Sequence, residues 1–240
     1  MSRRKEQEMR SYWNERAKEN APWYVDTSLA FDQPDMEKFF AEGRRIVAYA
    51  FDDAAFSVPS NRFALEIGCG LGRVCLALAD RFDHVLGIDI APDMGAQARR
   101  LVTDPRVSFV LGDGSSLGMV RTGSVDAVFS FTVFQHIPSI KVISKYIEET
   151  GRTLAPGGMF VFQWNNSGGT IWWAIRRRLI GLLRRVGLSR DVHGRDDPAF
   201  LGSRVSLRRI KAALERGGMQ LNEAKNLGTL YAFAWAVRRP

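Results

Sequence analysis

The run from Glu66 to Gly72 carries the strongest chemical signal in the sequence. Gly68, Gly70 and Gly72 follow an apolar stretch at alternate positions, so the backbone can turn sharply and approach a ligand without a Cβ atom in the way. A helical pattern begins here, and the N–H groups at a helix start suit a carboxylate or a phosphate. Arg73 stands where the G-x-G-x-x-G dinucleotide fingerprint has glycine. The run predicts a ligand-binding turn, and a turn built only for tight packing is the alternative.

Two further acidic residues follow apolar runs, where a bound ligand would lie. Asp89 ends the second predicted strand, where an acid can accept hydrogen bonds from ribose hydroxyl groups. Capping of the next helix is its alternative role. Asp113, in Gly112-Asp113-Gly114 after the third strand, is placed to accept from the exocyclic amine of a base. Its alternative is an ordinary turn aspartate.

Strands and helices alternate along the chain around these residues. Short apolar runs predict buried strands over Phe63–Ile67, His84–Ile90, Val107–Leu111, Val125–Phe131 and Met159–Trp164. Apolar residues at spacings of three and four predict helices over Gly72–Arg81, Pro92–Leu101, Ser139–Thr153 and Leu207–Arg216, and N-terminal helices broken at Asn20-Ala21-Pro22. Strands that alternate with helices imply a parallel sheet covered on both faces.

The end of the chain has a different pattern. An apolar segment over Met219–Ala224 is followed by the turn Asn226-Leu227-Gly228, and aromatic or branched residues then alternate with alanines within Thr229–Val237. This period of two predicts a strand, and the pair predicts a hairpin that closes a mixed sheet.

Composition indicates one compact soluble protein. The 240 residues are 45% hydrophobic and 25% charged, a balance that permits a well-buried core. No run reaches the ~18 apolar residues of a membrane span, and the charged start, Met1 to Arg10, lacks the apolar segment of a secretory signal. The two cysteines, Cys69 and Cys75, lie at the predicted turn and indicate reduced thiols. We therefore expect a cytoplasmic protein.

The positive charge belongs to one part of the chain. The formal net charge is +8, and the segment from Thr170 to Lys211 alone contains ten arginines and one lysine against three aspartates. The rest of the chain is therefore balanced. This distribution argues against a nucleic-acid surface spread over the whole protein.

Five motifs, in order and spacing, resemble those of the class I S-adenosylmethionine-dependent methyltransferases. They are Glu66 through Gly72, Gly87-Ile88-Asp89, Leu111-Gly112-Asp113, Val125-Asp126-Ala127-Val128 and Leu154-Ala155-Pro156-Gly157-Gly158. The resemblance covers about Phe63 to Trp164. It implies an α/β, Rossmann-like fold: a seven-stranded, mostly parallel sheet with an antiparallel C-terminal hairpin and helices on both faces.

The resemblance also implies S-adenosyl-L-methionine as the cofactor. The glycine turn and the helix start would hold the methionine part, and Glu66 would fix its amino group, directly or through the turn. Asp89 would bind the ribose, and Asp113, with Gly114 or Ser115, would meet the adenine. The implied cofactor contacts are Glu66, Gly68, Cys69, Gly70, Asp89, Ile90, Asp113, Gly114, Ser115 and Phe131.

Gln135 and His136 follow the fourth strand, at the rim where the substrate and the methyl group would meet. An imidazole with a pKa near 6.5 can take a proton from a hydroxyl or ammonium nucleophile, which makes His136 the candidate catalytic base. The alternative is a structural histidine that binds the backbone before Ile137-Pro138. Both residues are predicted substrate contacts.

Other substrate contacts are predicted outside the core motifs. The resemblance places the N-terminal helices over the cofactor, so Trp13 and Tyr24 would wall the substrate pocket, although aromatic residues at helical spacing also serve as plain core. His193 is a further candidate contact. The three histidines are scattered and the two cysteines flank one turn, so no metal-site spacing is present and we expect no metal.

Residues after the fourth strand narrow the reaction that the resemblance implies. Ser130-Phe131-Thr132-Val133 lacks the Asn/Asp-Pro-Pro-aromatic tetrad of enzymes that methylate adenine N6 or glutamine amides. It also lacks the cysteine of cytosine-C5 methyltransferases and the aspartate of metal-dependent catechol methyltransferases. Direct, metal-independent transfer to oxygen or nitrogen remains, a reaction in which positioning supplies most of the rate.

An arginine-rich insertion follows the fifth strand. After the loop Asn165 to Gly169, one helical face carries Ile171, Ile175, Leu179, Leu182, Leu183 and Val186, and the other carries Arg177, Arg178, Arg184 and Arg185. This helix could pack as a lid over the active site or lie on an anionic membrane surface, an option that Trp172 and Trp173 favour. It could also bind an acidic substrate or RNA phosphates.

These observations predict methyl transfer to an oxygen or nitrogen of a small molecule, acidic or lipophilic in character. An RNA methyltransferase that uses the insertion is one alternative, and a non-catalytic cofactor-binding module is the other. Transient contact with a membrane surface stays open. The predicted organisation is an N-terminal helical cap over 1–58, a cofactor-binding core over 59–164, a basic lid insertion over 165–205, and a C-terminal helix and hairpin over 206–240.

Overall fold

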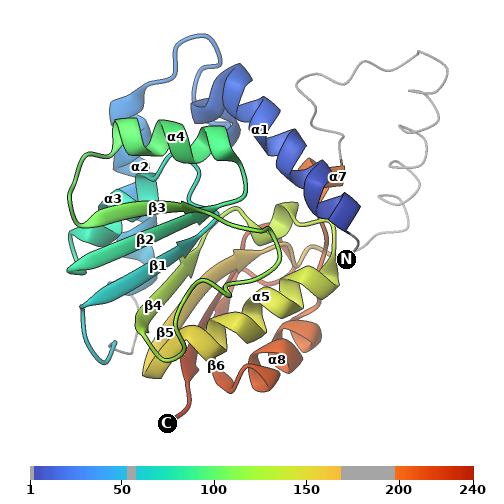
Figure 1. The fold of residues 1–240 in the computed structure, drawn as a ribbon. Helices are drawn as coiled ribbons and strands as arrows, with labels where there is room; N and C mark the ends of the chain where they lie inside the picture. Colours follow the sequence, from blue (N-terminus) through green and yellow to red (C-terminus); the bar gives the residue numbers. More distant parts are fainter. Residues whose placement is uncertain (1–2, 53–57, 169–197) are drawn as a thin grey trace, which may run out of the picture.

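Seven strands form a single sheet in the order β3-β2-β1-β4-β5-β7-β6. The computed structural model describes residues 3–52, 58–168 and 198–240. The strands are β1 (Phe63–Ile67), β2 (His84–Asp89), β3 (Val107–Leu111), β4 (Val125–Ser130), β5 (Leu154–Trp164), β6 (Met219–Lys225) and β7 (Ala232–Arg238). Strands β1 to β5 are parallel, whereas β7 runs antiparallel to both β5 and β6. This confirms the predicted mixed sheet (Figure 1).

Helices cover both faces of this sheet (Figure 1). They are α1 (Arg3–Val25), α2 (Met36–Phe51), α3 (Arg73–Ala79), α4 (Pro92–Leu101), η1 (Phe134–His136, a 3₁₀ turn), α5 (Ile140–Thr153), α7 (Pro198–Leu201) and α8 (Leu207–Arg216). Asn20 interrupts the helical backbone of α1 with φ −166°, two residues before Pro22, at the predicted break. None of the helices within the described ranges is long and apolar enough to span a bilayer.

Alternation along the strands divides the core into two layers. In β1, Leu65 and Ile67 pack with residues of α5 and α8. Ala64 packs in the other layer, with residues of α2, α3 and α4. Successive side chains of a strand point to opposite faces, so a strand covered on both sides must be apolar throughout. All six residues of β4 are buried, and its two polar side chains are hydrogen-bonded: Asp126 accepts from the N–H groups of Arg62 and Phe63, and Ser130 donates to the Ile67 carbonyl.

Helix α1 passes over the edge where the parallel strands end (Figure 1). The strands β1 and β4 are neighbours there, and the chain leaves them towards opposite sides of the sheet. Open α/β sheets bind ligands at such a switch point. The fold therefore brings the loops after β1, β2, β3 and β4 to one edge beneath α1.

Two predictions on the chain organisation have different outcomes. The strand β5 begins at Leu154 rather than at Met159, because Leu154 pairs with Val125 ahead of a register shift in the β4–β5 ladder. The predicted amphipathic helix of the insertion lies in 169–197, outside the described residues, and stays a prediction.

Candidate functional site

The turn between β1 and α3 is built from glycines in the left-handed region. Gly68, Gly70 and Gly72 have φ values of +73°, +51° and +81°, which residues with a Cβ atom rarely adopt. The N–H groups of Gly68 and Cys69 donate to the Ile88 carbonyl, at 2.7 and 3.1 Å, and so tie the turn to the end of β2. The turn is therefore held against the end of β2, and it presents backbone atoms rather than side chains to the cavity.

Asp89, the last residue of β2, points its carboxylate at this turn. One oxygen accepts from the N–H of Gly70 at 2.9 Å, and the other accepts from the N–H of Ala91 at 2.8 Å, just before α4 begins. Burial raises the pKa of this carboxyl group above its ordinary value. A carboxylate has about four lone-pair sites, so it can also accept from a ligand hydroxyl, and the ribose role and the helix-cap role are compatible in this geometry.

Glu66 is buried beneath the turn, 3% exposed. Its carboxyl group accepts a hydrogen bond from the Cys75 thiol at 2.9 Å. Burial raises the pKa of Glu66 to about 8, against the opposing influence of the Arg73 charge. A cationic ligand group beside Glu66 would restore its ionised form, because a nearby opposite charge favours the carboxylate.

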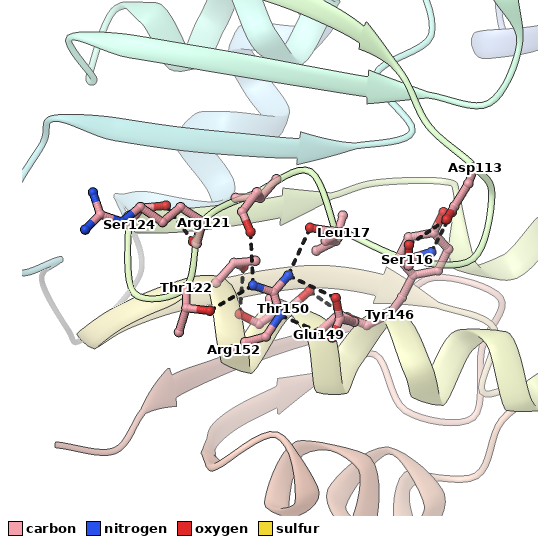
Figure 2. Close-up of polar contacts among 12 residues, drawn as sticks. Asp113, Ser116, Leu117, Arg121, Thr122, Ser124, Tyr146, Glu149, Thr150 and Arg152 are labelled. Atoms are coloured by element: carbon pink, nitrogen blue, oxygen red, sulfur yellow. Dashed lines mark hydrogen bonds and ion pairs between the residues drawn. The ribbon is translucent and has the colours of Figure 1, made fainter.

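In the loop after β3, the side chain of Asp113 is hydrogen-bonded to residues of the same loop. Asp113 accepts hydrogen bonds from the N–H groups of Ser115 and Ser116, each at 2.7 Å. It also accepts from the Ser116 hydroxyl at 2.5 Å (Figure 2). Burial acts to raise the pKa of Asp113, but these hydrogen bonds outweigh it and hold the pKa below its ordinary value. The arrangement is that of a turn-closing aspartate.

Arg152 of α5 anchors the later part of this loop, from Leu117 to Thr122. Its guanidinium donates to the carbonyl groups of Leu117 and Val120 at 2.9 and 3.0 Å and to the Thr122 hydroxyl at 3.0 Å, and it pairs with Glu149 at 2.9 Å (Figure 2). One arginine thus satisfies several loop groups at once. It holds the loop that follows β3 in place over α5.

A cavity of about 890 Å³ opens among these loops. It brings together most of the residues predicted for the site: Trp13, Tyr24, Glu66, Gly68, Cys69, Gly70, Asp89, Ile90, Gly114, Phe131, Gln135 and His136. Asp113 and Ser115 are not among its lining residues, although their neighbours Gly112 and Gly114 are. His193 lies outside the described residues.

His136 is half-buried and lines the cavity together with its neighbour Gln135. Its Nδ1 atom hydrogen-bonds the Phe200 carbonyl of α7, and its Nε2 atom lies 3.0 Å from the amide nitrogen of Gln135. The Trp13 ring meets the imidazole edge-to-face at 5.2 Å between centroids. Burial lowers the pKa of His136 to about 4. The imidazole is therefore neutral at physiological pH, and both of its nitrogens have partners.

Three residues that line or support the cavity were not among the predicted site residues. Arg73, whose side chain is 6% exposed, forms an ion pair with Asp26. Tyr146 of α5 lines the cavity near the β3 loop, and burial raises the pKa of its hydroxyl above the ordinary value. Arg73 gave a signal, as the single charged residue of the otherwise apolar α3, whereas Tyr146 sits in an ordinary amphipathic pattern.

Comparisons with known proteins agree with this geometry. A family model described as "Methyltransferase domain" matches residues 65–162. A ubiquinone biosynthesis O-methyltransferase from Xanthomonas oryzae is 28% identical over 144 residues, which cover 53% of this chain and 59% of that protein. The chain thus spans little more than half the length of this relative.

Solved structures share the fold at low identity. A Haloferax volcanii methyltransferase complexed with the Trm112 activator superposes with a TM-score of 0.60 at 17% identity, covering 91% of this chain and 96% of that one. The Synechocystis magnesium protoporphyrin IX methyltransferase, solved with bound S-adenosylhomocysteine, gives 0.54 at 19% identity and covers 83% of each chain.

Proposed function

We propose that this chain, which contains a methyltransferase domain and has the fold of class I S-adenosylmethionine-dependent methyltransferases, transfers a methyl group from S-adenosylmethionine to an oxygen or nitrogen of a small molecule without a metal ion. The observation that carries the proposal is the convergence of the left-handed glycine turn, Glu66 and Asp89 on one cavity under α1. When bound, the cofactor supplies an activated methyl group on a sulfonium.

The residues on the cofactor side suit the groups of S-adenosylmethionine. Glu66 offers a carboxyl group to the ammonium, and its raised pKa fits a site completed by a cation. Asp89 offers carboxylate lone pairs to the ribose hydroxyls. Ile90 and Gly114 line the cavity beside the β3 loop and offer an apolar surface to a flat base. Side chains larger than hydrogen at Gly68 or Gly70 would narrow the turn that the methionine part must approach.

The opposite side of the cavity suits a small acceptor. Trp13, Gln135, His136, Phe200 and Tyr231 line it, a mixture of aromatic faces and amide or imidazole groups. Pockets of this composition bury most of a small ligand and orient it through a few polar contacts. The similarity to an enzyme named for ubiquinone biosynthesis O-methylation supports a small-molecule acceptor. We keep both oxygen and nitrogen as the acceptor atom.

Positioning is the main chemical task left to this chain. The β4 strand ends at Ser130, whose hydroxyl donates to the Ile67 carbonyl at 3.1 Å, and the next residues, Phe131, Thr132 and Val133, bring no carboxylate to the cavity. This supports direct transfer in a site that orients the acceptor and excludes water. His136, neutral and hydrogen-bonded, fits an orienting role on the acceptor side.

The test separates cofactor binding from acceptor choice. Mass spectrometry of the purified chain, followed by calorimetric titration, should detect S-adenosylhomocysteine or S-adenosylmethionine bound one to one. Incubation with tritium-labelled methyl donor should then label compounds in a panel of hydroxylated and amino small molecules, with total RNA assayed in parallel. A folded chain that binds neither compound would refute the cofactor assignment. Label that enters RNA and no small molecule would refute the acceptor assignment.

A further inference from the structure

Gln163 lies on β5, outside the cavity, with its side chain fully buried. Its amide oxygen accepts from the N–H of Thr132 at 3.0 Å, and its amide nitrogen donates to the Leu230 carbonyl at 2.5 Å. Both partners are backbone groups with fixed roles, since an N–H only donates and a carbonyl only accepts. The orientation of the Gln163 amide is therefore determined by the backbone.

This orientation fixes the orientation of a second side-chain amide, that of Gln135. The Gln163 nitrogen also donates to the side-chain oxygen of Gln135, at 2.8 Å. The oxygen of Gln135 must face Gln163, so its nitrogen faces Nε2 of His136, 3.0 Å away. An amide nitrogen only donates, so Nε2 of His136 must accept. At its other nitrogen, Nδ1, His136 meets the Phe200 carbonyl, which only accepts, so Nδ1 must carry the proton.

We propose that Gln163 is a positioning residue that, through Gln135, holds His136 as the neutral Nδ1–H tautomer with its Nε2 lone pair occupied. The inference rests on the proposed function for its catalytic consequence, but the tautomer itself does not depend on it. His136 then orients the acceptor side of the cavity as a fixed, uncharged group. It does not serve as a base with a free lone pair.

The same amide supports the backbone at the cavity rim. Thr132 is one of two described non-glycine residues with a positive φ, at +56°, and a β-branched residue is disfavoured there. Its N–H donates to Gln163, and its neighbours on either side, Phe131 and Val133, also line the cavity. Gln163 thus holds a strained turn and the His136 tautomer from a single buried position.

The isosteric change Gln163→Glu reverses the chain of donors. In its ionised form the carboxylate still accepts from Thr132, but it cannot donate to Gln135 or to the Leu230 carbonyl, so the Gln135 amide must turn its nitrogen towards residue 163. Its oxygen then faces Nε2 of His136, which must be protonated to meet it. Because Nδ1 still faces the Phe200 carbonyl, we expect the imidazole of this variant to carry both protons.

Nitrogen-15 NMR of histidine-labelled protein at pH 7, with and without S-adenosylhomocysteine, tests the proposal. The variant His136→Gln assigns the resonances. We expect a protonated Nδ1 and an unprotonated Nε2 in the wild type, and protonation of both nitrogens in Gln163→Glu. The matched control is Gln97→Glu, which changes a half-buried amide that donates to the Ala17 carbonyl at 2.7 Å and does not line the cavity. It should leave the His136 signals unchanged.

Three results would overturn the proposal: a wild-type His136 protonated at Nε2, a Gln163→Glu variant with the wild-type tautomer, or the same change in Gln97→Glu. Calorimetry separates this failure from failure of the proposed function. Gln163→Glu should bind S-adenosylmethionine within about three-fold of the wild type, because no cofactor-side contact changes, while its methyl transfer falls at least ten-fold through kcat. A chain that binds no cofactor in any form would refute the function and leave the tautomer result standing.

Discussion

Arg73 and Asp26 form an ion pair at 2.7 Å that joins the first residue of α3 to the residue that follows α1. The same guanidinium donates to the Val25 carbonyl at 3.2 Å and lies over the Phe39 ring, 5.0 Å from its centroid. Because Arg73 directly follows the glycine turn, the pair fastens the end of α1 beside the cavity. One buried ion pair thus links the end of α1, which lies over the cavity, to the helix that follows the glycine turn.

Asp26→Ala should lower the free energy of unfolding by about 3–5 kcal/mol, because it leaves a buried guanidinium without its counter-charge. Urea unfolding followed by circular dichroism measures the loss. The control is Asp52→Ala, which removes an ion pair with Arg81 whose side chains are 57% and 36% exposed. An exposed pair of this kind contributes at most about 1 kcal/mol. Equal losses in the two variants would contradict the role of the Arg73 pair.

Asp89→Ala should weaken the binding of S-adenosylmethionine by roughly 1.5–3 kcal/mol, the scale of lost charge-assisted hydrogen bonds. Calorimetric titration of the folded variant gives the affinity. The matched control is Asp93→Ala, an acid in the first turn of α4 that bonds Asn14 and does not line the cavity. Unchanged affinity in Asp89→Ala would remove this residue from the cofactor site.

Gly202→Ala should separate α7 from η1. Gly202 has φ +52°, and an added Cβ atom would overlap the Gln135 carbonyl oxygen, so strain and a clash coincide. We expect a loss of stability of about 1–3 kcal/mol from backbone strain alone, and more from the clash. Gly228→Ala is the control, because Gly228 has φ +82° but no heavy atom within 4 Å of the added Cβ. Thermal unfolding of both variants isolates the contact, and identical midpoints would show that α7 does not pack closely on η1.

Glu66 should make the unliganded chain less stable as the pH rises. Burial raises the pKa of Glu66 to about 8 from an ordinary value of 4.5. The folded state therefore keeps a proton that the unfolded chain releases, so the stabilisation is complete below pH 4.5 and is lost as the pH rises through 8. Thermal midpoints between pH 5 and pH 9 should fall less in Glu66→Gln than in the wild type. Parallel profiles would contradict the raised pKa.

The fold could be predicted because its signals are local. Each parallel strand is a short apolar run between breakers, and Phe63–Ile67 and Val107–Leu111 were predicted with the bounds that the structure has. The glycine turn and the position of Asp89 could be predicted equally well, because the turn needs glycines in the left-handed region and the acid ends a strand. Patterns within one window of sequence suffice for features of this kind.

The acceptor side could not be predicted in the same way, because its geometry depends on distant partners. The state of His136 is set by Gln163, Phe200 and Leu230, from three separate segments. No periodicity links them. Asp113 shows that a local motif can also leave a side chain's direction open. Its motif predicted an adenine contact, whereas its side chain closes a turn with Ser115 and Ser116 and does not line the cavity. The adenine role for Asp113 and Ser115 remains a prediction.

The strand order has a consequence for how this protein can diversify. Residues of the glycine turn and Asp89 come from the β3-β2-β1 half of the sheet, whereas Gln135, His136 and Tyr231 come from the β4-β5-β7-β6 half. On the proposed function, donor recognition and most of acceptor recognition, apart from Trp13 of α1, are therefore inherited through different stretches of the chain. Recombination near the β3–β4 connection, or grafting of 198–231 from a relative, exchanges one without rebuilding the other. New acceptors can thus be acquired while the cofactor pocket is conserved.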